Sequence, residues 1–190
     1  FGLQASNTST AFELKNGSFA ASITGLGSIP ATSVLVRYTG ATAVTGGTTL
    51  TVGSTSYTFN NDIAANTVAL EVTGFAANVA NFVSLSGNLG FKKSGTDIVA
   101  VGSGVSASLT AGAAVSVSLT NASFGLQASN TSTAFELKNG VFAASITGLG
   151  SITATSVLVR YTGAIAVTGG TTLTVGSTSY TFADDIAANT

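Results

Sequence analysis

The sequence contains no cysteine, histidine, methionine or tryptophan, and its single proline is Pro30. Without cysteine, the chain can form neither disulfide bonds nor thiolate metal sites. Without histidine, it lacks the usual general base, the commonest nitrogen ligand for metals and any Ser-His-Asp triad. These absences exclude several large classes of enzyme and metalloprotein.

Charge is also scarce. Only 7% of the residues are charged, and six Lys+Arg against seven Asp+Glu give a net charge of −1, whereas about 25% charged residues is usual. The pair Lys92-Lys93 is too short for a basic patch, so we expect no nucleic-acid partner. Because no long apolar run is present, we expect no transmembrane helix.

The few acidic residues do not form a recognisable catalytic or metal-binding pattern. They are Glu13, Asp62, Glu71, Asp97, Glu136, Asp184 and Asp185. No pair is placed as a two-carboxylate glycosidase site requires, and Glu13 and Glu71 fall on polar strand faces, where solvated carboxylates are expected. The oxygen-rich loop 60–62 could suit calcium, but Asn-Asn-Asp there becomes Ala-Asp-Asp at 183–185, which favours an ordinary polar turn. The sequence predicts no catalytic residues, no cofactor and no metal site.

The most prominent feature is an internal repeat. The segment FGLQASNTSTAFELKNG opens the chain at Phe1 and returns at Phe124, so the period is 123 residues. Residues 1–67 and 124–190 differ only at five pairs of positions, which are Ser18/Val141, Pro30/Thr153, Thr42/Ile165, Asn60/Ala183 and Asn61/Asp184. We therefore divide the chain into one full period, 1–123, of unknown boundary phase, and a partial second copy, 124–190. Both ends lie within a period, which suggests a window cut from a longer array.

Within the repeat, large apolar and small polar residues alternate. Phe12 and Leu14 share one face and Glu13 and Lys15 the other, which is the period of two expected for a strand. The segment 75–81 is the one candidate for a helix. The pattern predicts an all-β fold of strands about six residues long, joined by tight turns into an antiparallel meander or β-sandwich, with the apolar face inward.

Six two-residue loops would keep the apolar residues in register. They are Asn7-Thr8, Asn16-Gly17, Gly53-Ser54, Ser94-Gly95, Gly102-Ser103 and Asn121-Ala122. The third pairs Leu50 with Tyr57, and the fourth sets Lys92 opposite Asp97 as an exposed ion pair. An inner sub-repeat of about 35 residues instead favours a β-solenoid, which stays open as the alternative fold.

Serine, threonine and alanine dominate the outer face, where natural sheets usually carry charge that prevents edge-to-edge association. Two interpretations stay open. The face is either a neutral, solvated surface or a surface that packs into a filament or surface layer.

Near-identical repeats of this length, rich in Thr, Ser, Val, Ala and Gly and free of Cys, resemble the tandem arrays of giant bacterial cell-surface and biofilm proteins. The repeated segments FGLQASNTSTAFELKNG and TSVLVRYTG carry this resemblance. It implies an extracellular or cell-surface location and a role in adhesion, matrix or filaments. Unlike calcium-stiffened adhesins, the chain lacks clustered acidic residues at module junctions.

The sequence therefore predicts a non-enzymatic, structural extracellular repeat protein that self-associates into a filament, fibre or cell-surface stalk. One alternative is an adhesin that binds glycans or surfaces through loops. Exposed aromatics near turns, such as Tyr38 or Tyr57, would be its signature, although both fall on the inward face. The second alternative is a β-helical carbohydrate-active enzyme, which would need clustered carboxylates in a groove.

Overall fold

The computed structural model describes residues 1–23, 27–79 and 82–190. Thirteen strands, and no helix, occupy these residues. The strands are β1 (Gly2–Ala5), β2 (Thr10–Ile23), β3 (Gly27–Thr39), β4 (Thr49–Val52), β5 (Thr55–Thr58), β6 (Thr67–Val79), β7 (Val83–Ser94), β8 (Asp97–Ala111), β9 (Val115–Ala128), β10 (Thr133–Ile146), β11 (Gly150–Thr162), β12 (Thr172–Val175) and β13 (Thr178–Thr181). The described residues thus hold no helix long and apolar enough to cross a membrane.

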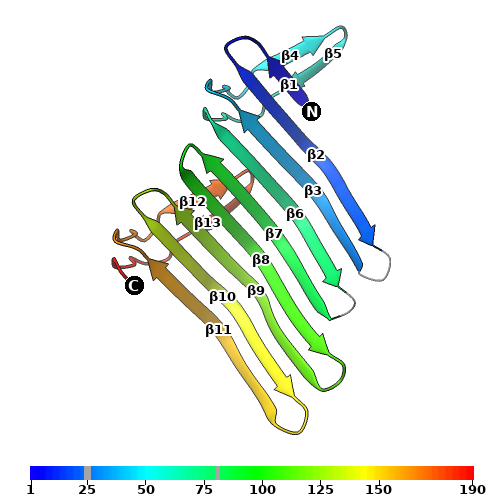
Figure 1. Cartoon of the computed structure of the whole chain (residues 1–190), viewed down its shortest axis with the longest axis vertical. Helices are drawn as coiled ribbons and strands as arrows, with labels where there is room; N and C mark the ends of the chain where they lie inside the picture. The colour runs from blue at the N-terminus through cyan, green and yellow to red at the C-terminus, as the bar shows by residue number, and fades with distance from the viewer. Residues whose placement is uncertain (24–26, 80–81) are drawn as a thin grey trace.

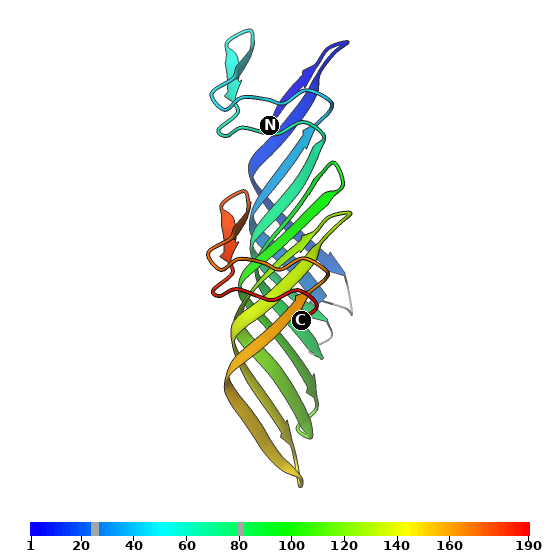
Figure 2. The same ribbon diagram turned by 90° about the vertical axis from the view of Figure 1, so that its left-hand side faces the viewer.

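Nine of the strands form one twisted sheet in the order β1-β2-β3-β6-β7-β8-β9-β10-β11 (Figures 1 and 2). All eight neighbouring pairs are antiparallel. The predicted all-β antiparallel meander is confirmed, and no two strands of the described residues pair in parallel as a solenoid would require. The inner sub-repeat corresponds to one pair of adjacent strands, since Ser84 of β7 and Ser118 of β9 both pair with Ser108 of β8.

Two hairpins project from the same face of this sheet. Residues 40–66, with β4 and β5, form arm 1, and residues 163–190, with β12 and β13, form arm 2 (Figure 2). Each arm follows the strand of its own copy, β3 or β11. Six sheet positions separate β2 from β10, so one sequence period adds six strands to the sheet. The sheet is continuous where the first copy ends, because β9 runs through residues 123 and 124.

The long strands are 12 to 15 residues, about twice the predicted length. A row of β-bulges crosses the sheet at mid-strand, where the register shifts. Left-handed residues lie at the shifts, and these are Asn16, Gly74, Gly104, Asn121 and Asn139. Asparagine and glycine adopt this conformation at low cost. A bulge bends its strand and increases the local twist.

The bulges explain three wrong turn predictions. Asn16-Gly17, Gly102-Ser103 and Asn121-Ala122 lie inside β2, β8 and β9 and do not form hairpin loops. A two-residue turn and a one-residue bulge both shift the apolar alternation from even to odd positions. The alternation alone therefore cannot distinguish between the two.

The other three loops do join strands. Leu3 pairs with Phe12 and Leu50 with Tyr57, as predicted. The loop predicted at Ser94-Gly95 lies one residue later, because Ser94 pairs with Asp97. Lys92 then faces Val99, so the expected pairing of Lys92 with Asp97 is wrong. The helix candidate is also wrong over 75–79, which belongs to β6, while residues 80 and 81 lie outside the described part of the chain.

The apolar face of the sheet is turned away from the arms, and we call it the open face. In the half of the sheet between the bulges and the strand ends that join the arms, cross-strand partners on this face form three rows. In order toward the bulges, they are Leu3, Phe12, Tyr38, Val68, Lys93 and Ile98; then Leu14, Val36, Leu70, Phe91, Ala100, Leu126, Phe135 and Tyr161; then Val34, Val72, Leu89, Phe124, Leu137 and Val159. Many of these side chains are exposed, including Tyr38. The expectation that this face is the inward one is wrong, because the buried core lies under the arms, on the face that carries the charged residues.

Candidate functional site: the contact between arms and sheet

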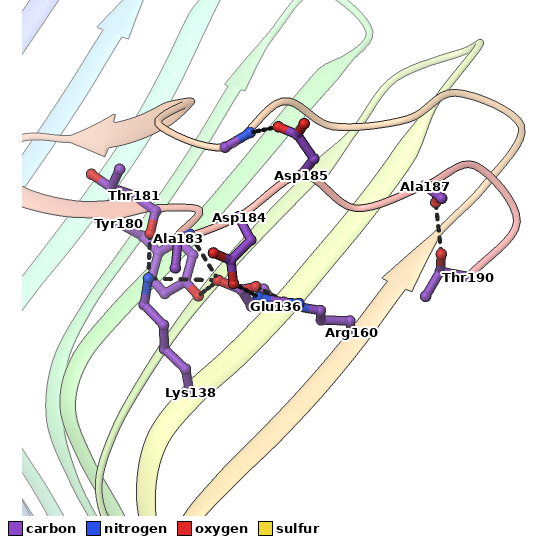
Figure 3. A network of polar contacts seen from close by, with 11 residues as sticks. Glu136, Lys138, Arg160, Tyr180, Thr181, Ala183, Asp184, Asp185, Ala187 and Thr190 are labelled. Atoms are coloured by element: carbon purple, nitrogen blue, oxygen red, sulfur yellow. Dashed lines mark hydrogen bonds and ion pairs between the residues drawn. The ribbon is translucent and has the colours of Figure 1, made fainter.

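A buried glutamate anchors the base of arm 2 to the sheet (Figure 3). Glu136 of β10 is fully buried. Its Oε1 accepts a hydrogen bond from the Tyr180 hydroxyl at 2.5 Å, and its Oε2 accepts one from Arg160 Nε at 2.6 Å. Lys138 Nζ lies 3.5 Å from the same carboxylate and 4.6 Å from the centre of the Tyr180 ring. Every charge in this cluster therefore has an opposite charge beside it, as burial of a carboxylate requires.

The cluster fixes the protonation of its members. Burial alone would raise the pKa of Glu136, but the hydrogen bonds from Tyr180 and Arg160 outweigh it and hold the pKa below its ordinary value. Burial, together with the hydrogen bond to Glu136, raises the pKa of the Tyr180 hydroxyl. Near neutral pH the glutamate is ionised and the tyrosine is protonated. That combination suits a fixed structural hydrogen bond.

The same cluster recurs at the base of arm 1. Glu13 is fully buried, and it accepts hydrogen bonds from Tyr57 at 2.8 Å and from Arg37 at 2.5 Å. Lys15 Nζ donates to the Thr58 carbonyl at 2.7 Å and lies 4.7 Å from the centre of the Tyr57 ring. The expectation of a solvated Glu13 is therefore wrong, because the arm that follows it in the sequence folds back over the polar strand face.

Two glycines of the sheet provide seats for large side chains of arm 2. A Cβ at Gly125 of β9 would lie 2.3 Å from the Tyr180 ring, and one at Gly90 of β7 would lie 2.8 Å from Val175 Cβ. Arm 2 therefore contacts the sheet backbone at Gly125 and Gly90 more closely than would be possible if either position carried a side chain. Around these seats, a core of apolar side chains joins the sheet to the arm. It consists of Ala69, Val101, Ala134, Leu173, Val175, Tyr180, Phe182 and Ile186.

The tip of arm 2 is locked onto β6 by Glu71, a residue that lies more than a hundred positions earlier in the sequence. Glu71 Oε1 accepts hydrogen bonds from Ser177 N–H at 3.0 Å, Ser177 Oγ at 2.7 Å and Thr178 Oγ1 at 2.8 Å. Glu71 is buried, so the expectation that it is solvated is also wrong. We call these contacts the Glu71 lock. The lock joins the second copy of the repeat to the first.

The loop 60–62 and its copy 183–185 close the base of each arm. Asp62 Oδ1 accepts a hydrogen bond from Gly46 N–H, and Asp185 Oδ1 accepts one from Gly169 N–H, both at 2.7 Å. Where the first copy has Asn61, the second has Asp184, which pairs with Arg160 Nη2 at 2.6 Å. These oxygens bind the protein's own donors. Within residues 1–23, 27–79 and 82–190, no group of three or more acidic side chains could hold a metal ion.

A groove of about 490 Å³ separates the base of arm 1 from the tip of arm 2. Arg37, Asp62 and Lys92 line it together with Val175 of the arm 2 tip. Successive arms therefore lie next to one another on the sheet, with this groove between them.

Sequence reasoning missed the arm contacts, because it paired each strand only with its sequence neighbours. One signal was present. The five positions that differ between the copies do not include Glu13, Arg37 or Tyr57, or their counterparts Glu136, Arg160 and Tyr180. In comparisons with known proteins, no family model matches the chain, and neither a curated protein nor a solved structure is significantly similar to it. Inferences about function therefore rest on the geometry.

Proposed function

We propose that this chain is a structural, non-enzymatic segment of an extracellular or cell-surface scaffold, in which tandem repeats extend a single β-ribbon as a filament, fibre or stalk. The observation that carries the proposal is the overlap between copies. Arm 2 belongs to the second copy, but its β12 and β13 lie over β6, β7, β8 and β9, most of which belong to the first copy.

The overlap makes neighbouring repeats depend on each other. The sheet continues through hydrogen bonds across the copy boundary, and the Glu71 lock adds a side-chain bond between copies. Stability in such an array is the sum of repeat and interface contributions, so a long chain is held along its whole length. That property suits a protein that extends from a cell and bears load.

The geometry gives the ribbon a defined growth per repeat. Six strands spaced about 4.8 Å apart would lengthen the ribbon by about 29 Å for each period. Modules on flexible linkers would grow by a different and more variable amount, since linker length adds to module length. The growth per repeat is therefore a direct readout of the architecture.

The proposal is tested with arrays of two, three, four and six periods, studied by small-angle X-ray scattering and negative-stain electron microscopy. We expect rigid particles whose length grows by about 29 Å per period and whose melting temperature rises with repeat number. Beads of constant melting temperature joined by flexible segments would contradict the proposal.

A further inference from the structure

We propose that the open face is the contact surface for a second copy of this chain, so that two sheets pack face to face with their arms outward. The inference adds lateral pairing to the proposed ribbon and rests on the proposed function only for its role in a fibre.

The open face is continuous across the bulges. A groove of about 420 Å³ crosses the bulge row, lined by Leu14, Phe19, Val34, Leu70, Val72 and Phe75. On the next strands, a Cβ at Gly102 would meet both Phe124 and Val105, which lie on opposite sides of the bulge. The apolar side chains of both strand halves therefore point to the same side of the sheet.

The charges of the molecule are segregated away from this face. Lys93 is the one charged side chain that the strand alternation places there within the described strands. The other charged residues belong to the arms or to the arm-facing side of the strands, and half of them form the ion pairs around Glu13 and Glu136. A face this poor in charge carries little that would oppose association with its own copy.

The size of the face suits a stable dimer. Eight long strands and the short β1 give a face about 40 Å wide and about 40 Å long, or about 1,600 Å². If half of this area met its partner, the two copies would bury about 1,600 Å² in total, which is a standard specific interface. Exposed apolar patches beyond a few hundred Å² mark interaction surfaces.

The composition of the face favours a second copy over an anionic membrane. Attraction to anionic lipid needs several Lys or Arg side chains at the surface, whereas the described strands place Lys93 alone on the open face. Lys93 lies near the strand ends, where it can stay in water at the rim of a dimer. Two twisted sheets of this kind pack about 10 Å apart with interdigitated side chains, and the groove beside Phe19 and Phe75 can accept side chains of the partner.

The first test is sedimentation equilibrium of the full chain over a wide concentration range. The variant Leu70→Ser/Phe91→Ser alters a cross-strand pair at the centre of the face, where the two side chains are 40% and 45% exposed. We expect a dimer for the unmodified chain and a dissociation constant at least about 100-fold higher for the variant. The control is Ile165→Thr, which removes an apolar side chain of similar exposure from arm 2 and restores the residue found at Thr42.

A chain that stays monomeric throughout, or a folded double variant that dimerises as well as the control, would overturn the inference. Because the double variant could fail to fold, a second measurement uses the absence of cysteine. A nitroxide on Leu85→Cys, on the open face, should give intermolecular dipolar coupling that disappears on dilution with unlabelled protein. The same label on Ile165→Cys should give much weaker coupling.

A vesicle-binding assay distinguishes pairing of two copies from binding of the open face to lipid. Binding of the unmodified chain as a monomer to phosphatidylcholine vesicles, lost in the double variant, would overturn pairing and assign the face to lipid. The array lengths above do not depend on this face, so failure of lateral pairing and failure of the ribbon proposal give different results.

Discussion

Arm 1 and arm 2 have nearly the same sequence but different surroundings. Each arm rests its base on the strand pair that carries its buried glutamate, β2 with β1 or β10 with β9. Beyond that base, arm 2 continues over β8, β7 and β6, whereas the tip of arm 1 projects past the edge of the sheet (Figure 1). Val175 is 1% exposed, and its counterpart Val52 is 83% exposed. The comparison teaches that the tip of arm 2 is stabilised by strands of the first copy, a support that the tip of arm 1 lacks in this structure.

The largest expected difference comes from a charge placed at the tip. Val175→Asp would bury a carboxylate against Gly90, among the apolar side chains of the arm 2 core, and Lys92 in the adjoining groove would offset only part of the cost. We expect a loss of about 3–5 kcal/mol in the docking of arm 2. Val52→Asp changes an exposed position, so its effect on stability should be within about 0.5 kcal/mol. Urea unfolding followed by tyrosine fluorescence measures both. Equal losses of stability in the two variants would contradict the difference between the tips of arm 1 and arm 2.

The Glu71 lock should rank next. Glu71→Ala removes the acceptor for Ser177 and Thr178 and should cost about 2–3 kcal/mol, while Glu71→Gln, which keeps an acceptor oxygen, should cost less. The matched pair is Ser177→Ala against Ser54→Ala, because Ser54 is its exposed counterpart. A loss of stability in the first and none in the second is expected in chemical denaturation. Similar losses in both would show that the lock contributes nothing.

The glycines beneath Tyr180 and Tyr57 should give a smaller difference in stability between the two arms. Gly125→Ala would push a methyl group into the Tyr180 ring, and we expect a cost of about 1–3 kcal/mol from overpacking. Gly2→Ala would meet the Tyr57 ring at the same 2.3 Å, but β1 is a four-residue edge strand that can shift outward. Thermal melts of the two variants should therefore show the larger decrease for Gly125→Ala, and the reverse order would contradict this account.

The pH dependence follows from the Glu136 cluster. Because the pKa of Glu136 is lower in the folded chain, its contribution is present above its unfolded pKa and is lost as the pH falls through the folded pKa. The raised pKa of Tyr180 gives a contribution that is full below its unfolded pKa of about 10 and is lost as the pH rises through the folded value. Melting temperatures should therefore decrease below about pH 4 and above about pH 10. Glu136→Gln should weaken the decrease in melting temperature at acid pH. An unchanged decrease would count against a stabilising role for the Glu136 cluster.

The smallest effect is expected at Asp184, one of the five positions at which the copies differ. Asp184→Asn removes the pair with Arg160 and restores the residue found at Asn61. Asp184 is mostly exposed, and exposed ion pairs contribute about 0–1 kcal/mol. Thermal melts should show a small decrease in the melting temperature of this variant at low salt, and a still smaller decrease at moderate salt, because salt screens the ion pair. A loss comparable to that of Glu71→Ala would mean that the arm base depends on this pair.

The strand pattern could be predicted from the sequence because burial of one face imposes a period of two. It identified the apolar residues of the sheet and the turn of each arm, as the pairing of Leu50 with Tyr57 shows. Strand length was not predictable, since the bulge at Asn16 leaves the same pattern as a turn. The Glu71 lock was also out of reach, because it joins residues more than a hundred positions apart and no local pattern encodes that pairing.

The most direct test of the account is amide hydrogen exchange measured by NMR on the unmodified chain. Individual amides must be assigned, because the tips of the two arms have the same sequence and their peptides would share the same mass. The account predicts that exchange at Leu173–Val175 and Thr178–Tyr180 is at least about tenfold slower than at Leu50–Val52 and Thr55–Tyr57. Equal exchange rates in the two arms would contradict the claim that the tip of arm 2 is held in place by strands of the first copy.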